Sequence, residues 1–302
     1  AILQSFFPTK KFLPEFFSFS KRIATMEEVR RGTVRPSATF SGYELFAEYM
    51  ALCTVFLYLI IRRARTLVAK TWWSVGMALV VLALFTTATR SAPLVLAGGM
   101  LYMVMVGDRG IPRAQQLRVL ILVMLGFYLS LAFLGSFTSL MFERLSSLGA
   151  DDSSVHSRTE VATAALEAIS RKPLLGHGPF IPAKSFATAV GKNVHNLYLH
   201  TAYTIGLPGL AAFVWFLVVL VRTSLRHARD RTLSPRSREI GVILHVTLVM
   251  FLVDQLKIEY TRDAMTMHLA WMHFGLIMAQ ERVLRREQAM GPVGQENPGW
   301  TG

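Results

Sequence analysis

Seven stretches of this chain are apolar over about the length that crosses a membrane, and no other feature restricts its fold as strongly. The hydrocarbon core of a bilayer is about 30 Å thick, which requires roughly 20 helical residues. The third stretch and the last two are short, so their boundaries are approximate. Because no soluble fold repeats such runs so often, we predict an all-α, polytopic membrane protein with about seven transmembrane helices. The stretches are residues 42–61, 72–89, 92–107, 117–136, 196–221, 240–256 and 264–280.

The overall composition agrees with this class of protein. Hydrophobic residues make up 52% of the 302 residues and charged residues only 17%, whereas soluble domains carry about 25% charged residues. The net charge of +13 would fit binding to nucleic acid or to an anionic surface. Basic loops are expected in a membrane protein, however, so the positions of the charges matter more than their sum. The single cysteine, Cys53, rules out an internal disulfide and leaves the compartment open.

Positive charges are concentrated in every second connection between the apolar stretches. Cytoplasmic loops carry an excess of Lys and Arg, so we place the connections after the first, third, fifth and last stretches in the cytoplasm. The turn at 89–91, the loop at 137–195 and the turn at 257–263 then face outward. The basic residues that set this orientation are Arg62, Arg63, Arg65, Lys70, Arg109, Arg113, Arg118, Arg222, Arg226, Arg229, Arg231, Arg236, Arg238, Arg282, Arg285 and Arg286.

This orientation divides the chain into five segments. Residues 42–136 hold the first four transmembrane helices, 137–195 form an outer loop with short helices, and 196–280 hold the last three helices. Residues 281–302 form a cytoplasmic tail. Residues 1–41 are expected on the outer face, as an aromatic and basic interfacial segment that follows helices upstream of this chain. Because exported segments are usually poor in Lys and Arg, the basic residues here favour an anionic group nearby.

The outer loop contains a predicted helix and a glycine turn. Ser157 and Glu160 have the spacing of a capping box, and the helix should end before Pro173. Arg158 then lies in the first turn, where the helix dipole disfavours a cation unless an anion is close. The Gly-His-Gly-Pro turn at 176–179 would let the backbone approach a ligand closely. The residues expected on the apolar face of the helix are Val161, Ala165, Ala168 and Ile169.

His195 precedes the fifth stretch and has two interpretations. It is either a half-solvated residue beside a helix cap formed by Asn193 or Asn196, or a catalytic or substrate-positioning imidazole. An ordinary histidine pKa near 6.5 allows proton transfer at neutral pH. A helix would place His195, Asn196, Leu199 and Tyr203 within a stripe about 100° wide that could line one pocket. Asn196 and Tyr203 are therefore candidate substrate contacts.

Other ionisable residues near the outer face also have two interpretations each. Arg90 and Arg35 either extend from a helix end to the membrane surface or bind phosphate through the two-pronged guanidinium. Glu44 and Glu48 lie one turn apart near the outer end of the first helix. Carboxylates inside a membrane usually mark function, but these two could equally pair with outer basic residues. Of the two, we select Glu44 as a candidate substrate contact.

The remaining titratable residues do not indicate a metal site. Asp151 and Asp152 could imitate a metal-binding pair with His156, but adjacent carboxylates in a Ser- and Gly-rich stretch more often belong to a solvated loop. We therefore expect no metal and no other cofactor. Three further histidines have no informative spacing and are expected to be packing or interfacial residues: His245, His268 and His273.

Four stretches on the predicted outer face resemble the O-antigen ligase family of bacterial surface-glycan ligases and polymerases. In chain order they are RPSATFSGYELFAEYMAL, TTATRSAPL, SRTEVATAALEAISRKPLLGHG and VHNLYLHTAYTIGLPGLAAF. The resemblance extends from about residue 31 to residue 280. Ala88 and Ala92 occupy positions at which the family often has glycine.

The resemblance implies a GT-C-like helical fold in the bacterial inner membrane, with an active site facing the periplasm. It implies transfer of a glycan from a polyprenyl (undecaprenyl) diphosphate carrier to an acceptor hydroxyl on a glycan or lipid, without metal. By its match to the family's motif, His195 would be the essential histidine. Arg90 and Arg158, with Arg35 as a weaker match, would hold the diphosphate. The sequence does not separate ligase from polymerase, and a transporter of polysaccharide intermediates is the main alternative.

Overall fold

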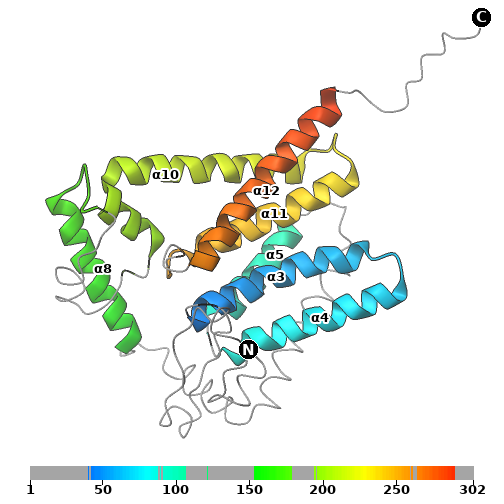
Figure 1. Ribbon diagram of the computed structural model, residues 1–302, viewed down its shortest axis with the longest axis horizontal. Helices are drawn as coiled ribbons and strands as arrows, with labels where there is room; N and C mark the ends of the chain where they lie inside the picture. The colour runs from blue at the N-terminus through cyan, green and yellow to red at the C-terminus, as the bar shows by residue number, and fades with distance from the viewer. Residues whose placement is uncertain are drawn as a thin grey trace, which may run out of the picture.

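The computed structural model describes residues 40, 42–87, 89, 91–106, 121, 153–178, 194, 196–258, 260 and 264–289. These residues form helices and contain no strand (Figure 1). The prediction of an all-α protein is therefore confirmed for the described part of the chain. The helices are α3 (Tyr43–Arg63), α4 (Leu67–Thr86), α5 (Ser91–Val106), α8 (Ser153–Arg171), α10 (Leu197–Arg229), α11 (Pro235–Asp254) and α12 (Ala264–Ala289).

Six of the seven predicted stretches coincide with a helix, but the ends differ. α10 ends at Arg229 rather than at residue 221, and α12 continues to Ala289 rather than to residue 280. α4 begins at Leu67 rather than at residue 72, because the Thr66 hydroxyl caps it by accepting from the Ala69 amide at 3.1 Å. The predicted boundaries followed apolarity alone, whereas polar residues extend these helices. The fourth stretch, 117–136, lies outside the described residues except for Ile121.

The described helices have the surface of a membrane protein. α3, α4 and α10 are long and apolar enough to cross a bilayer, and α5 is apolar but shorter. Large apolar side chains lie exposed along the helices, among them Leu67, Val68, Trp72, Leu94, Met105, Trp215 and Met272. So large an apolar surface is unusual on a soluble protein and suits contact with lipid. The chain is an integral membrane protein; the number of seven spans and the direction of insertion stay predictions.

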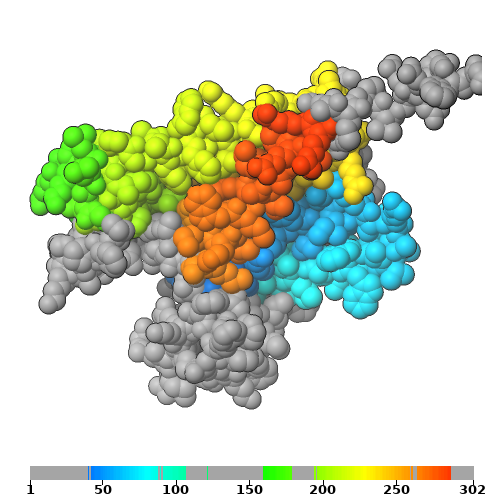
Figure 2. All heavy atoms as spheres, turned by 45° about the horizontal axis from the view of Figure 1, so that its top comes forward, coloured from blue at the N-terminus to red at the C-terminus, as the bar shows by residue number. Residues whose placement is uncertain are grey.

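α11 is the central helix and joins two apolar cores. Residues 241–248 of α11 are all buried. One core packs α11 against α3, α4 and α5, around Val55, Leu84 and Ile243. The other packs it against α10 and α12, around Leu220 and Phe274. In Figure 2, α12 lies between α10 and α3 on the visible face, and α8 lies at one extremity of α10.

The contacts between helices agree with the predicted alternation of inner and outer ends. At the end predicted to be cytoplasmic, Arg62 Nη1 is 2.9 Å from Glu239 Oε1, and Arg226 Nη2 is 2.7 Å from Glu281 Oε2. At the opposite end, the Lys257 ammonium donates to Glu48 Oε1 at 2.9 Å. Residues predicted to share a side of the membrane therefore lie at the same end of the bundle. We call the end that contains Glu48 and Lys257 the outer end.

Candidate functional site at the outer end

Several predicted site residues lie outside the described part of the chain. These are Arg35, Arg90 and His195, together with the carboxylates Asp151 and Asp152. Of Arg158, only the backbone is described, within α8. The geometry of the site is therefore given by the elements that flank these residues.

The turn that contains Arg90 is short and is held by buried threonines. α4 ends at Thr86 and α5 begins at Ser91, which confirms a tight connection at this point. The Thr87 hydroxyl lies 2.7 Å from the Leu84 carbonyl oxygen and 2.9 Å from the Thr89 hydroxyl. Thr86, Thr87 and Thr89 are all buried. The backbone on both sides of Arg90 is thereby fixed at the outer end of the bundle.

Asn196, the residue after His195, is held in place by both ends of its side-chain amide. Its side-chain oxygen accepts from the Tyr198 and Leu199 amides at 2.9 and 3.0 Å and caps α10. Its side-chain nitrogen donates to the Leu256 carbonyl oxygen at 2.8 Å, just beyond the end of α11. The interpretation of Asn196 as a helix cap is confirmed, and its contribution to substrate binding stays a prediction. On the other side of His195, Val194 is buried.

α10 is interrupted one-third of the way along. Gly206 has φ 77° and ψ 176°, a conformation that is essentially restricted to glycine, and Pro208 follows it. The break leaves backbone groups without their helical partners. The turn after α8 supplies new ones: the His177 amide donates to the Tyr203 carbonyl oxygen at 2.8 Å, and the Gly178 amide donates to that of Thr204 at 2.9 Å. In return, the Leu207 amide donates to the Pro173 carbonyl oxygen at 2.7 Å.

The prediction of a glycine turn after α8 is confirmed, and its partner is now known. Gly176 and Gly178 have φ values of 65° and 86°. A Cβ atom on Gly176 would lie 2.6 Å from the Gly206 nitrogen and from the Thr204 oxygen. The close backbone approach expected at this turn is therefore made to α10. The turn fastens the outer loop to the broken helix.

Two details predicted for the outer helix are wrong. α8 begins at Ser153, so Ser157 lies inside the helix and does not cap it. Arg158 consequently lies in the second turn, where the helix dipole acts less strongly on a charge. The prediction failed because the helix also includes the four residues before Ser157. The end of α8 before Pro173 is confirmed.

Two residues of the predicted stripe, Leu199 and Tyr203, face α8. Leu199 and the buried Tyr203 pack against the apolar face predicted for α8, around Val161 and Ala165. The Tyr203 ring stacks on the His177 ring with centroids 4.6 Å apart and planes 9° apart. The His177 Nε2 atom lies 2.8 Å from the Ala168 carbonyl oxygen. Tyr203 is thus packed between the start of α10 and the turn, and its contact with a substrate stays a prediction.

A buried ionic cluster connects α3 with the end of α11. Lys257 Nζ contacts both Glu48 Oε1 and Asp254 Oδ1, at 2.9 and 2.5 Å. The Glu48 and Asp254 side chains are both buried. Burial of Lys257 disfavours its charged form, but the two carboxylates outweigh this effect and raise the pKa of Lys257. The pairing of Glu48 with an outer basic residue is therefore confirmed, whereas a role for Glu44 in binding stays a prediction.

Asp254 and Lys257 were not predicted to be partners. A signal was present, because an acid and a base three positions apart at the end of an apolar stretch rarely occur by chance inside a membrane. Asp254 was included in the predicted span of 240–256, and Lys257 was counted only as the start of an outer turn. Their meeting with Glu48, some 200 positions away, depends on the packing of α3 against α11.

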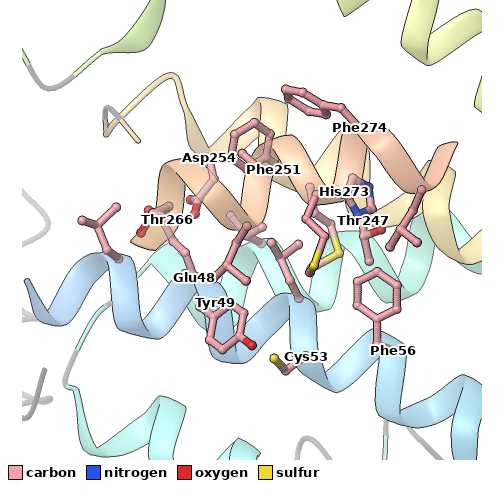
Figure 3. A pocket seen from close by; sticks show the side chains of 18 residues that line it. Glu48, Tyr49, Cys53, Phe56, Thr247, Phe251, Asp254, Thr266, His273 and Phe274 are labelled. Carbon is pink, nitrogen blue, oxygen red and sulfur yellow. Dashed lines mark hydrogen bonds between the residues drawn. The ribbon is translucent and has the colours of Figure 1, made fainter. Parts of the chain in front are cut away.

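An apolar pocket of about 250 Å³ lies beside this cluster, between α3, α11 and α12. Figure 3 shows Glu48 and Asp254 near one end of the pocket and His273 and Phe56 near the other. The lining is almost entirely apolar and includes Leu45, Leu52, Met250 and Leu269. The pocket can accept an apolar chain, with polar groups available at its outer end.

The described histidines away from this end have local partners. His245 is fully buried, with its ring nitrogens 2.9 Å from the hydroxyls of Tyr102 and Ser224. His273 lies 3.3 Å from the Thr247 hydroxyl. The expectation that His245 is a packing residue is confirmed, whereas His273 also lines the apolar pocket. Within the described residues, no group of three His, Cys, Asp or Glu side chains is placed to hold a metal ion.

Comparison with known proteins identifies the region that contains these elements. A family model described as O-antigen ligase matches residues 75–214. This region belongs to the O-antigen ligase family. No curated protein matches the chain. The ligase region includes three of the four stretches on which the resemblance rests, and it extends from the middle of α4 to the first half of α10.

The match of this region to the O-antigen ligase family agrees with the coarse expectations from the sequence. It links the chain to glycan transfer in O-antigen assembly and to a glycosyltransferase-like enzyme that acts on glycan and lipid-linked substrates in a membrane. The Thr-Arg-Ser turn, the backbone of α8, the docked glycine turn and the break at Gly206 all lie within the matched region. The stretch before α3, which contains Arg35, precedes it.

Proposed function

We propose that this protein transfers a glycan from a polyprenyl diphosphate carrier to an acceptor hydroxyl on the periplasmic face of the inner membrane. The observation that supports the proposal is that the first family stretch packs at the outer end with the end of α4 and Ile258, and that the third stretch is bonded to the fourth. Phe40, Leu45 and Ala83 pack together with Ile258, beside the carbonyl that binds Asn196. The glycine turn after α8 is bonded to α10 a few residues farther on.

In the proposed reaction, the residue from one family stretch acts as the base, and residues from the other three bind the diphosphate. The acceptor hydroxyl forms a new bond to the anomeric carbon of the donor sugar, and the bond from that carbon to the diphosphate breaks. His195 accepts the hydroxyl proton as general base. Arg90 and Arg158, with Arg35, offset the negative charge that develops on the departing diphosphate, which removes the need for a metal ion.

The apolar pocket suits the lipid part of such a carrier. It lies between α3, α11 and α12 near the outer end, and its lining is almost entirely apolar. Lys257 is already paired with Glu48 and Asp254, so it is not a free cation for a diphosphate. In this proposal the pocket takes part of the polyprenyl chain, and the arginines take the diphosphate.

A transporter of polysaccharide intermediates is the second candidate, because the interrupted α10 is a feature that transporters share. Two observations weigh against it. The freed backbone groups of α10 are bonded to the protein's own outer turn, and so are not left to coordinate a substrate. The buried ionic cluster lies at the outer end, whereas transporters place such groups near the middle of the bilayer.

Deletion of the gene, followed by analysis of the carrier lipids, tests the proposal. A polymerase predicts that single repeat units accumulate on the carrier. A ligase predicts long lipid-linked chains that never reach their acceptor. Carrier-linked glycan that is retained on the cytoplasmic face and missing from the outer face would favour a transporter and contradict the proposal.

A further inference from the structure

The turn that docks on α10 carries exposed apolar side chains. Leu174 and Leu175 are 70% and 87% exposed. They lie beside Ile205 and Leu207 of α10, each 48% exposed, because the Leu207 amide is bonded to Pro173. Together these four residues make one apolar surface, which we call the turn surface.

The length of α10 indicates how deep the turn surface lies in the membrane. The basic end of the helix begins at Arg222 and includes Arg226, which lie 16 and 20 positions after Gly206. At about 1.5 Å per residue these distances are roughly 24 and 30 Å, close to the hydrocarbon thickness of about 30 Å. If the basic end lies at one membrane surface, Gly206 lies at the other. The turn at 172–178 is bonded to residues on both sides of Gly206 and must then lie at the same depth.

The charges beside the turn surface fit the headgroup region of a membrane. Arg171 and Lys172 directly precede Pro173, and both are exposed. Arg171 has only a loose contact with Glu167, at 3.8 Å between two exposed side chains. Long basic side chains next to apolar ones are typical of segments that lie in the interface.

We propose that the turn at 172–178 is inserted into the outer leaflet, with Leu174 and Leu175 among the acyl chains and Lys172 at the lipid phosphates. The surface is continuous with the lipid-facing side of α10, and its backbone bonds to α10 fix it there. The outer loop is thus anchored at two points, by the bonds to α10 and by lipid. This inference does not depend on the proposed glycan transfer.

Fluorescence quenching at a single cysteine tests the insertion. Cys53 is replaced by Ala, and Leu175→Cys is compared with Glu167→Cys, which lies exposed on α8. Each protein is labelled with a fluorophore and reconstituted into vesicles of zwitterionic and anionic phospholipid. We expect lipids brominated near the headgroup to quench the label at 175 severalfold more than the label at 167. Aqueous iodide should show the reverse order.

Two results would overturn the proposal. Equal quenching of both labels by iodide would place the turn in water. A label at 175 that neither quencher reaches would mean that another part of the chain, or a partner protein, covers it. If the Cys53 replacement impairs insertion, the same variants are made with Cys53 present, and the labelling of the parent protein is subtracted.

Discussion

Asn196 uses both ends of its side-chain amide, so substitutions at this position can separate two contributions. Asn196→Ala removes the cap of α10 and the bond to the Leu256 carbonyl. Loss of a cap costs about 0.5–2 kcal/mol, and loss of the second bond costs about 1 kcal/mol more. Asn196→Ser should recover most of the cap but not the longer contact. Thermal unfolding in detergent is expected to rank wild type above Ser and Ser above Ala.

The same variants test the predicted contact of Asn196 with substrate. If Asn196 acts only as a cap, Asn196→Ser should retain transfer with an unchanged KM. A raised KM in a protein that remains folded would support a direct contact. Equal stability of all three proteins would contradict the structural role itself.

Arg90 provides a test of diphosphate binding at a single residue. A guanidinium can donate two parallel hydrogen bonds to phosphate oxygens, whereas an ammonium is a point charge. We expect Arg90→Lys to lose nearly as much glycan transfer as Arg90→Ala, when both variants are inserted at the level of the wild type. Transfer by Arg90→Lys at the wild-type rate would indicate that Arg90 serves only to reach the membrane surface.

The break in α10 is an element-scale feature that depends on one glycine. Gly206→Ala would place a side chain at φ 77° and against the carbonyl groups of Pro173 and Leu174. The backbone strain alone costs about 1–3 kcal/mol, and the turn must also shift. We expect a lower unfolding temperature and a loosened outer loop, seen as faster proteolysis after α8.

Gly275→Ala is a matched control for this substitution. Gly275 lies within α12, and a Cβ atom there would meet nothing within 4 Å. Because Ala favours a helix over Gly by roughly 1 kcal/mol, this variant should be at least as stable as the wild type. If Gly206→Ala behaves like Gly275→Ala, the docking of the turn on α10 is not needed for the fold.

The ionic contact between the inner ends of α10 and α12 should make the stability of the fold depend on pH. Burial of Glu281 would raise its pKa, but hydrogen bonds from His227, Arg285 and Arg226 outweigh this effect and lower it from 4.5 to about 2. A carboxylate with a lowered pKa stabilises the fold above its ordinary pKa, and this stabilisation is lost as the pH falls toward the lowered value.

Glu281→Gln should therefore be less stable than the wild type at pH 7, and the difference should shrink between about pH 4.5 and pH 2. Thermal unfolding in detergent at a series of pH values measures this difference. Glu167→Gln is the control, because Glu167 is exposed and contacts Arg171 only at 3.8 Å. A difference for Glu281→Gln that stays constant down to pH 2 would contradict the assigned ionic contacts.

At the scale of the whole molecule, the sequence was sufficient for features that repeat along the chain. The apolar runs predicted where the helices lie. The alternating basic connections predicted which helix ends lie together at the inner and outer ends of the bundle. The apolar face of α8 followed from its period, since Val161, Ala165 and Ile169 are all buried. Features that depend on contacts between distant segments could not be predicted in this way.

Two such features belong to the candidate site. The meeting of Glu48 with Lys257 requires α3 to pack against α11, and periodicity carries no information about that pairing. The residues Gly206 and Pro208 are of the kind at which a helix bends or breaks. That the break meets the turn at 172–178, joined through backbone bonds, became visible only in three dimensions.

The whole assembly also explains how residues far apart in sequence could act together. α4 and α5 flank the position of Arg90, α8 contains the backbone of Arg158, and α10 begins just after His195. The packing of Phe40, Ala83 and Ile258 and the bonds of Asn196 hold the α4–α5 turn and the start of α10 at the outer end. α8 is held against the start of α10 by the docked glycine turn.

Transfer by purified protein in vesicles tests the proposed reaction most directly. Wild type and His195→Ala are supplied with a polyprenyl diphosphate glycan and an acceptor, in the presence of a chelator, and the free polyprenyl diphosphate and the elongated acceptor are both measured. We expect the wild type to form the two products in equal amounts, and the inserted His195→Ala protein to form neither. Full transfer by His195→Ala, or transfer by the wild type that stops when metal is removed, would contradict the proposed mechanism.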